Sequence, residues 1–187
     1  YIFWALKVIK AFNEMQVCYI SKFEAKESTM KTIILDSNQI ERIIQRIAYQ
    51  IVESCHSEKT LVIVGVKPRG TWVANQIVKH LSEMNSPKCF YEELSINDDG
   101  SVSKFGTKIE GECVILVDDI LNSGATMMRA AAYINIANAR RIITACLVDR
   151  KHRRYPIQSD FTGLSLATTI RESLALIIEP NPTIILE

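Results

Sequence analysis

The fold of this chain is decided by the stretch Val114-Ile-Leu-Val-Asp118-Asp119-Ile-Leu-Asn122-Ser123-Gly124-Ala125-Thr126. Its first four residues are apolar, which is typical of a strand buried on both faces of a parallel sheet. Two carboxylates follow, and small residues then open a helix that we expect to reach about residue 137. Because ligands bind beyond the carboxyl ends of the strands in such sheets, the pattern predicts a binding site in this stretch.

The bend after the two carboxylates has the composition of an anion site. Free N–H groups at a helix N-terminus bind anions, Gly124 lets the backbone approach a phosphate, and the hydroxyls of Ser123 and Thr126 add donors. Asp118 and Asp119 cannot bind phosphate, but they can accept hydrogen bonds from sugar hydroxyls or hold a hard cation. The pattern therefore favours a phosphorylated sugar. The competing interpretation is a capped strand–helix turn with two solvated aspartates.

Short apolar runs alternate with helical patterns along the rest of the chain. A helix is expected after Asp36, whose carboxylate can cap it while Gln39 reaches back, and a second is expected around Trp72–Leu81. Strands are expected at Ile33–Leu35, Leu61–Val66, Cys89–Ile96, Val114–Val117, Ile142–Val148, Leu174–Ile178 and Thr183–Leu186. Strands that alternate with helices indicate an α/β domain with a mainly parallel central sheet flanked by helices.

Composition argues against several other kinds of protein. The formal net charge of +1 gives no overall attraction to nucleic acid or membranes, and no apolar run reaches the roughly 18 residues of a membrane span. The five cysteines form no CxxC pair, so neither a disulfide framework nor a zinc site is indicated, and a cytoplasmic setting fits. We expect a domain at residues 30–187 and an appendage at residues 1–29; the alternative for the latter is an ordinary helix docked on the domain.

The stretch 114–126 resembles the signature that type I phosphoribosyltransferases use to bind 5-phosphoribosyl 1-pyrophosphate (PRPP): four apolar residues, two acidic ones, then Thr/Ser-Gly-x-Thr/Ser. The segments 34–48, 64–70, 147–153 and 155–163 are similar to the PyrR branch. PyrR proteins combine uracil phosphoribosyltransferase activity with regulation of the pyrimidine operon through mRNA. The resemblance covers the chain from about residue 32 onward, and it implies a type I phosphoribosyltransferase fold with a small C-terminal hood.

The resemblance also implies roles for particular residues. Asp118 and Asp119 would act in catalysis together with Arg69, and the two carboxylates would hold Mg²⁺. The 5-phosphate of PRPP would be bound by Asn122, Ser123, Gly124, Ala125 and Thr126. Pyrophosphate would be held by Lys67, Pro68, Arg69, Gly70 and Arg150, and the nucleobase by Phe161 and Thr162 in the hood segment Asp160–Gly163. Pro68 makes a cis bond after Lys67 far less costly than elsewhere. Ile96–Thr107 is the expected flap.

Several positions depart from the family pattern. Asn122 stands where PyrR proteins usually have Tyr and 6-oxopurine enzymes have Asp, so a purine substrate is not expected. Ala125 replaces a common Arg or Lys, and the flap is short. PyrR regulators tend to carry basic or polar residues on the face that binds RNA. At those positions this chain has Gln45, Tyr49, Gln158 and Leu164. RNA affinity comes largely from Lys and Arg, so RNA binding is not expected.

The preferred hypothesis is therefore a PRPP-dependent nucleobase phosphoribosyltransferase that prefers uracil and works as a homo-oligomer, a dimer or larger, away from membranes. One alternative is a PyrR-like RNA-binding regulator of pyrimidine genes, which the basic run 150–154 favours. The other is a non-catalytic homologue that binds PRPP, which Ala125 and the short flap favour. The chemistry implied by the first hypothesis is displacement at C1 of ribose, with cationic character on the sugar as in glycoside hydrolysis.

Overall fold

The computed structural model describes residues 32–97, 101–103, 106–167 and 172–186. Ile33–Leu186 forms one compact unit, and the account below concerns that unit. The predicted appendage at residues 1–29 lies outside the described residues. None of the helices within the described ranges is long and apolar enough to cross a membrane.

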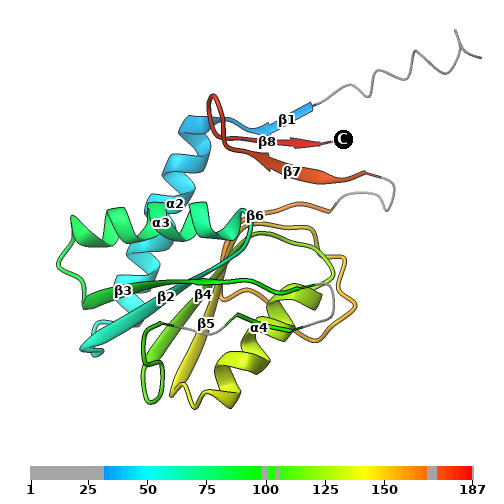
Figure 1. Ribbon diagram of the computed structural model, residues 1–187. Coiled ribbons are helices and arrows are strands. Elements are labelled where there is room, and N and C mark those ends of the chain that lie inside the picture. Colours follow the sequence, from blue (N-terminus) through cyan, green and yellow to red (C-terminus); the bar gives the residue numbers. More distant parts are fainter. Residues whose placement is uncertain (1–31, 98–100, 104–105, 168–171, 187) are drawn as a thin grey trace, which may run out of the picture. The chain divides into compact units, whose positions relative to one another are not determined.

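A five-stranded parallel sheet forms the centre of the unit (Figure 1). Its strands, in spatial order, are β3 (Lys88–Leu94), β2 (Thr60–Val66), β4 (Cys113–Leu121), β5 (Arg141–Asp149) and β6 (Phe161–Ser165). All four neighbouring pairs are parallel. The predicted α/β class and mainly parallel sheet are confirmed, and the carboxyl ends of the strands lie at one edge.

Helices cover both faces of this sheet (Figure 1). On one face, Ile63 and Ile115 pack with the buried sides of α2 (Ser37–Ser54) and α3 (Gly70–Ser82). On the other face, Val64 packs with Met127, Ala130 and Ile134 of α4 (Ala125–Ile136). Successive strand residues point to opposite faces, so a continuous apolar run supplies both cores at once.

Helix α2 begins as the sequence predicts. The Asp36 carboxylate accepts a hydrogen bond from the Gln39 backbone N–H at 2.8 Å, and the Gln39 side chain accepts one from the Asp36 N–H at 2.9 Å. This capping box satisfies two N–H groups that a helix start otherwise leaves without partners. The buried face of the helix comprises Ile40, Ile44, Ile47, Ala48 and Ile51.

A separate three-stranded sheet forms the hood, with strand order β1 (Thr32–Leu35), β8 (Thr183–Leu186), β7 (Leu174–Ile177). Strands β7 and β8 are antiparallel, as their short connection allows. The expected C-terminal hood is therefore present, but it also takes in β1 from the other end of the domain. The last strand along the chain lies in the middle of this sheet.

Two expectations about the central sheet are wrong. The segment 160–163 was expected in the hood, but Phe161–Ser165 is the edge strand β6, held because the Asp160 carboxylate accepts hydrogen bonds from Thr144 on β5 at 2.8 and 2.9 Å. A loop was expected from Asp118, but β4 continues to Leu121 because Asp118 pairs with Cys146 and Leu121 with Asp149 on β5.

Candidate active site

Three chain segments meet at the carboxyl edge of the central sheet. The loop Lys67–Gly70 follows β2, the bend Asn122–Gly124 follows β4, and the basic segment Arg150–Arg154 follows β5. Because β2, β4 and β5 are adjacent in the sheet, their C-terminal ends place these three segments side by side. The three segments that the sequence analysis assigned to one site are therefore neighbours, and their use as a site stays a prediction.

Asp118 and Asp119 stand at the end of β4 in different environments. Asp118 is only 9% exposed, whereas Asp119 is half-buried, and the Asp119 N–H donates to Asp118 Oδ1 at 2.9 Å. Burial, followed by the negative charge of Asp119, raises the pKa of Asp118 well above its usual value. The Asp118 side chain is thus nearly closed to solvent, while Asp119 is partly open.

Gly70 brings the loop after β2 into direct contact with these carboxylates. A Cβ atom added to Gly70 would lie 2.7 Å from the Val117 carbonyl oxygen, 2.9 Å from Asp118 Cα and 3.2 Å from Asp118 Oδ1. Only a glycine fits such an approach without moving the backbone. The loop predicted for pyrophosphate and the carboxylates predicted for ribose and Mg²⁺ therefore touch.

The rest of the loop after β2 is anchored at its base and open at its tip. The Lys67 N–H donates to the Leu94 carbonyl at 2.8 Å, and the Lys67–Pro68 peptide bond is cis. The Lys67 ammonium lies 2.7 Å from Glu93 Oε2, and its hydrogen bond lowers the pKa of Glu93. Arg69 immediately precedes α3 and is exposed. Sequence patterns did not identify Glu93 as the ion-pair partner of Lys67. Nothing in the sequence around either residue indicates that β2 and β3 are neighbours.

The bend after β4 turns sharply into α4. Gly124 has φ +84°, a conformation that favours glycine, and Ala125 is the first helical residue. The Ala125 N–H donates to the Ser123 hydroxyl at 3.3 Å, and Thr126 lies exposed in the first turn. The predicted arrangement of small residues at a helix N-terminus is present, and such an arrangement can bind an anion.

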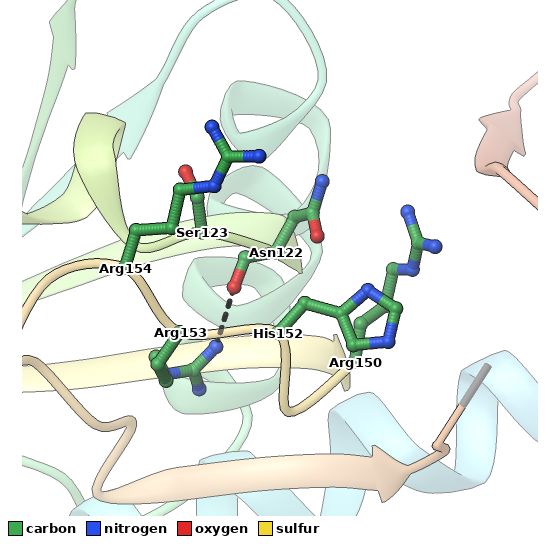
Figure 2. Close-up of a pocket in the computed structure, with 6 residues that line it drawn as sticks. All are labelled: Asn122, Ser123, Arg150, His152, Arg153 and Arg154. Carbon is green, nitrogen blue, oxygen red and sulfur yellow. Dashed lines mark hydrogen bonds between the residues drawn. The ribbon is translucent and has the colours of Figure 1, made fainter. Parts of the chain in front are cut away.

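A pocket with a volume of about 510 Å³ lies where the bend and the segment after β5 meet, and both contribute to its lining (Figure 2). Its lining consists of Asn122, Ser123, Arg150, His152, Arg153 and Arg154. The concentration of cationic side chains around two residues of the predicted phosphate cradle suits an anionic ligand. A run of basic residues is often just a solvated loop, but here four of its residues line a pocket.

The arginines of this pocket are held in different ways. Arg150 is 5% exposed and donates to the Glu172 carbonyl at 2.5 Å. Arg153 is half-buried and donates to the carbonyls of Leu121 and Asn122 at 3.3 and 2.8 Å. Arg150 lines the pocket together with Asn122 and Ser123 of the predicted 5-phosphate cradle. Its assignment to pyrophosphate stays a prediction.

The residues predicted for the nucleobase lie on β6, the neighbour of β5. Phe161 pairs with Ala145 and Thr162 with Cys146, and both side chains are half-buried. The Arg46 guanidinium donates to the carbonyls of Thr162 and Gly163 at 3.3 and 2.6 Å. Contact of Phe161 or Thr162 with a base stays a prediction.

The predicted flap is described in part. Ile96 and Val102 form an antiparallel bridge, the Asn97 N–H donates to the Ser101 carbonyl at 2.9 Å, and the Ser103 N–H donates to the Ser95 carbonyl at 3.0 Å. These contacts fit a hairpin. The turn residues 98–100 and the residues 104–105 lie outside the described residues.

A magnesium ion is compatible with the carboxylates. Asp118 and Asp119 offer oxygen ligands, but no group of three or more His, Cys, Asp or Glu side chains that could hold a metal gathers in the described part of the chain. Mg²⁺ usually binds through one or two carboxylates and takes its remaining ligands from water and substrate phosphates. The pair at the end of β4 fits that mode of binding, in which the substrate helps to hold the ion.

Comparison with known proteins gives the class. A family model described as the phosphoribosyl transferase domain matches residues 30–177. The fold resembles the hypoxanthine phosphoribosyltransferase of Trypanosoma cruzi, with a TM-score of 0.67 and 19% identity over 72% of this chain and 81% of that chain. A hypoxanthine-guanine phosphoribosyltransferase of Bacillus anthracis has a TM-score of 0.65 at 19% identity, with the same coverage of 72% and 81%. The chain belongs to the type I phosphoribosyltransferases.

Sequence relatives define the branch. The bifunctional protein PyrR of Brevibacillus brevis is 37% identical over 155 residues, which is 76% of this chain and 87% of the relative. That of Haemophilus ducreyi is 34% identical over 158 residues, 78% of this chain and 88% of the relative. Within its family the chain is PyrR-like, as the sequence segments predicted.

Proposed function

We propose that this phosphoribosyltransferase transfers the 5-phosphoribosyl group of PRPP to a nucleobase, with uracil preferred, and releases pyrophosphate. The observation that carries the proposal is the contact between Gly70 and Asp118, which joins the loop after β2 to the carboxylates that precede the small-residue bend. PRPP carries a phosphate on C5 of its ribose and a pyrophosphate on C1. The small-residue bend suits the 5-phosphate, the carboxylate pair suits the ribose hydroxyls, and the loop with Lys67 and Arg69 suits the pyrophosphate.

Each part of the site has a proposed role. The bend Asn122–Thr126 binds the 5-phosphate through N–H and hydroxyl groups. Asp119 and Asp118 accept hydrogen bonds from the ribose hydroxyls, and the exposed Arg69 grips pyrophosphate with its planar fork. When bound, Mg²⁺ would add positive charge beside the departing pyrophosphate.

The reaction is a substitution at C1 of the ribose. The bond from C1 to the pyrophosphate oxygen breaks and its electron pair leaves with pyrophosphate. A ring nitrogen of the base forms the new bond to C1, and its proton passes to an oxygen of the released pyrophosphate. The sugar becomes cationic as the old bond breaks, so the carboxylates at the end of β4 stabilise the transition state more than the ground state. Holding both reactants in line at this edge supplies most of the remaining catalysis.

Uracil is preferred over a purine in this proposal for two reasons. Asn122 carries an amide where 6-oxopurine enzymes have a carboxylate that manages the ring proton. The PyrR branch, to which the chain belongs, is associated with uracil phosphoribosyltransferase activity.

A nucleobase panel tests the proposal. The protein is incubated with PRPP, Mg²⁺ and each of uracil, hypoxanthine, guanine and adenine, and the nucleotides formed are separated and quantified. We expect uridine monophosphate to accumulate fastest, and an Asp118→Asn, Asp119→Asn double variant to form none. If no base yields a nucleotide, calorimetry with PRPP distinguishes the remaining cases: heat without turnover means a non-catalytic PRPP-binding protein, and no heat removes the proposal.

RNA-binding regulation is the second candidate function. The observation that favours it is the exposure of Lys151 and Arg154 on the basic segment after β5. Arg150 and Arg153 on the same segment, in contrast, donate to backbone carbonyls. Gel shifts with a pyrimidine leader RNA across a range of salt concentrations test this function, since binding through phosphates must weaken steeply as salt rises.

A further inference from the structure

The bend after β4 is fixed from behind through its carbonyl oxygens. The Leu121 carbonyl accepts from the Arg150 N–H at 3.0 Å and from Arg153 Nη1 at 3.3 Å. The Asn122 carbonyl accepts from the same Nη1 at 2.8 Å, the contact drawn as a dashed line in Figure 2. The Ser123 carbonyl accepts from the N–H groups of Arg154 and Tyr155, at 3.0 and 3.2 Å. Three consecutive carbonyls thus bond to one segment.

This arrangement sets the direction of the N–H groups on the bend. In a trans peptide the carbonyl and the N–H of the following residue point in opposite directions. The cis peptides among the described residues lie elsewhere, at Pro68 and Pro180. Bonding the carbonyls of 121–123 to the segment after β5 therefore turns the N–H groups of residues 122–124 away from that segment. Within the described residues, those three N–H groups donate to no acceptor.

Arg153 is itself held by a hydrogen bond to Ile157 and by an ion pair with Asp149. Its Nε donates to the Ile157 carbonyl at 2.8 Å, and its Nη2 lies 2.7 Å from Asp149 Oδ2. Asp149 is 2% exposed; burial acts to raise its pKa, but hydrogen bonds from Lys151 and the charges of Arg153 and Lys151 leave the pKa below its usual value. Asp149 is thus charged at neutral pH and fixes the guanidinium.

Packing holds the same segment close to the bend. A Cβ atom on Gly124 would lie 2.7 Å from Ile157 Cγ2 and 3.7 Å from both Arg153 Cδ and Tyr155 Cβ. The segment after β5 therefore lies against the turn into α4, and a shift of one would shift the other. Orientation of the bend depends on Arg153 through both hydrogen bonds and contact.

We infer that Arg153 is a positioning residue: anchored by Asp149, it aims the backbone N–H groups of residues 122–124 at the 5-phosphate of the substrate. The inference rests on the proposed function, because it assigns the ligand of the bend. Arg153 acts through the backbone, since its Nε and Nη1 donate to carbonyls of the chain and its Nη2 pairs with Asp149. A lysine cannot replace it, because an ammonium group lacks the planar fork that reaches several acceptors at once.

The neighbouring residue supplies a matched control. Arg154 lines the same pocket and carries the same charge, but its side chain is exposed and has no hydrogen bond or ion pair among the described residues. Replacing either arginine by methionine removes one positive charge from the pocket. Only replacement of Arg153 also releases the carbonyls of the bend. A difference between the two variants therefore reports orientation and not the loss of charge.

The test uses two ligands that separate the parts of the site. Ribose 5-phosphate carries the phosphate assigned to the bend, and pyrophosphate carries the group assigned to the loop Lys67–Gly70. Calorimetry measures the affinity of each for the wild type and for Arg153→Met, Arg153→Lys and Arg154→Met. We expect Arg153→Met and Arg153→Lys to bind ribose 5-phosphate about 10- to 100-fold more weakly, as expected when hydrogen bonds to a charged group are lost. Pyrophosphate affinity should stay within about twofold of the wild type, a change near RT in free energy.

Each other outcome has a defined meaning. Unchanged ribose 5-phosphate affinity in both Arg153 variants overturns the inference, as does an equal loss for both ligands, which would mean general damage to the fold. An equal loss in Arg154→Met overturns it too, because charge alone would then explain the effect. If Arg153→Met does not fold, Arg153→Lys and Asp149→Asn carry the same comparison. A wild type that binds neither ligand removes the proposed function itself.

Discussion

Replacing Gly70 by alanine tests whether the loop after β2 and the carboxylates of β4 work as one site. The new Cβ would lie 2.7 Å from the Val117 carbonyl oxygen, where ordinary contact begins at 3.4 Å, so the two backbones must separate by about 0.7 Å. Overpacking of this kind costs about 1–3 kcal/mol of stability. Misplacing catalytic groups by about 1 Å can cost about 10²-fold in rate, so we expect kcat/KM to fall by about 10- to 100-fold.

The matched control is Gly111→Ala, in the turn before β4. Gly111 has φ +77° and open space around its Cβ position, so alanine is strained there by about 1–2 kcal/mol but pushes nothing aside. Thermal unfolding and uridine monophosphate formation at 25 °C are measured for both variants. Both should lose stability, and only Gly70→Ala should lose activity. Wild-type kcat/KM in Gly70→Ala, or an equal loss in Gly111→Ala, would refute the reasoning.

Three further substitutions have expected outcomes. Asp118→Asn removes a charge from a side chain that is 9% exposed, so the melting temperature should rise while phosphoribosyl transfer is lost; a lower melting temperature would contradict this account of burial. Asp36→Ala breaks the capping box of α2 and should cost about 1 kcal/mol in urea unfolding, with kcat unchanged at 25 °C. Asp160→Ala leaves the Thr144 N–H without its acceptor, whereas the Thr144 hydroxyl keeps the Gln158 carbonyl, and should cost about 1–3 kcal/mol in the same assay; no change would show that solvent replaces the carboxylate.

Much of the fold follows from local sequence patterns. The buried parallel strands are visible as continuous apolar runs, because both of their faces are covered by helices. The start of α2 is visible because Asp36 and Gln39 make their capping bonds within four residues. The carboxyl edge of the sheet could therefore be predicted as the place of the site, together with the small-residue bend that opens α4.

What the sequence leaves open depends on partners far along the chain. The strand β4 continues through two carboxylates because β5 pairs with it, and local propensity gives no sign of that pairing. Asp160 joins the central sheet through Thr144, sixteen residues earlier. The role of Arg153 depends on which backbone carbonyls approach its guanidinium, which a run of basic residues does not specify. Sequence patterns predict where the candidate site lies, but tertiary contacts decide which groups each arginine bonds to.

The strand order of the hood has a consequence for how the domain is made. Strand β1 pairs with β8, which is synthesised about 150 residues later, or about 8–30 seconds at about 5–20 residues per second on the ribosome. Until then the nascent chain carries Thr32–Leu35 with an exposed strand edge, which is prone to pair with other chains. All strands of the central sheet precede β7 and β8 in the chain, so the hood cannot be completed until after the residues of the central sheet have been made.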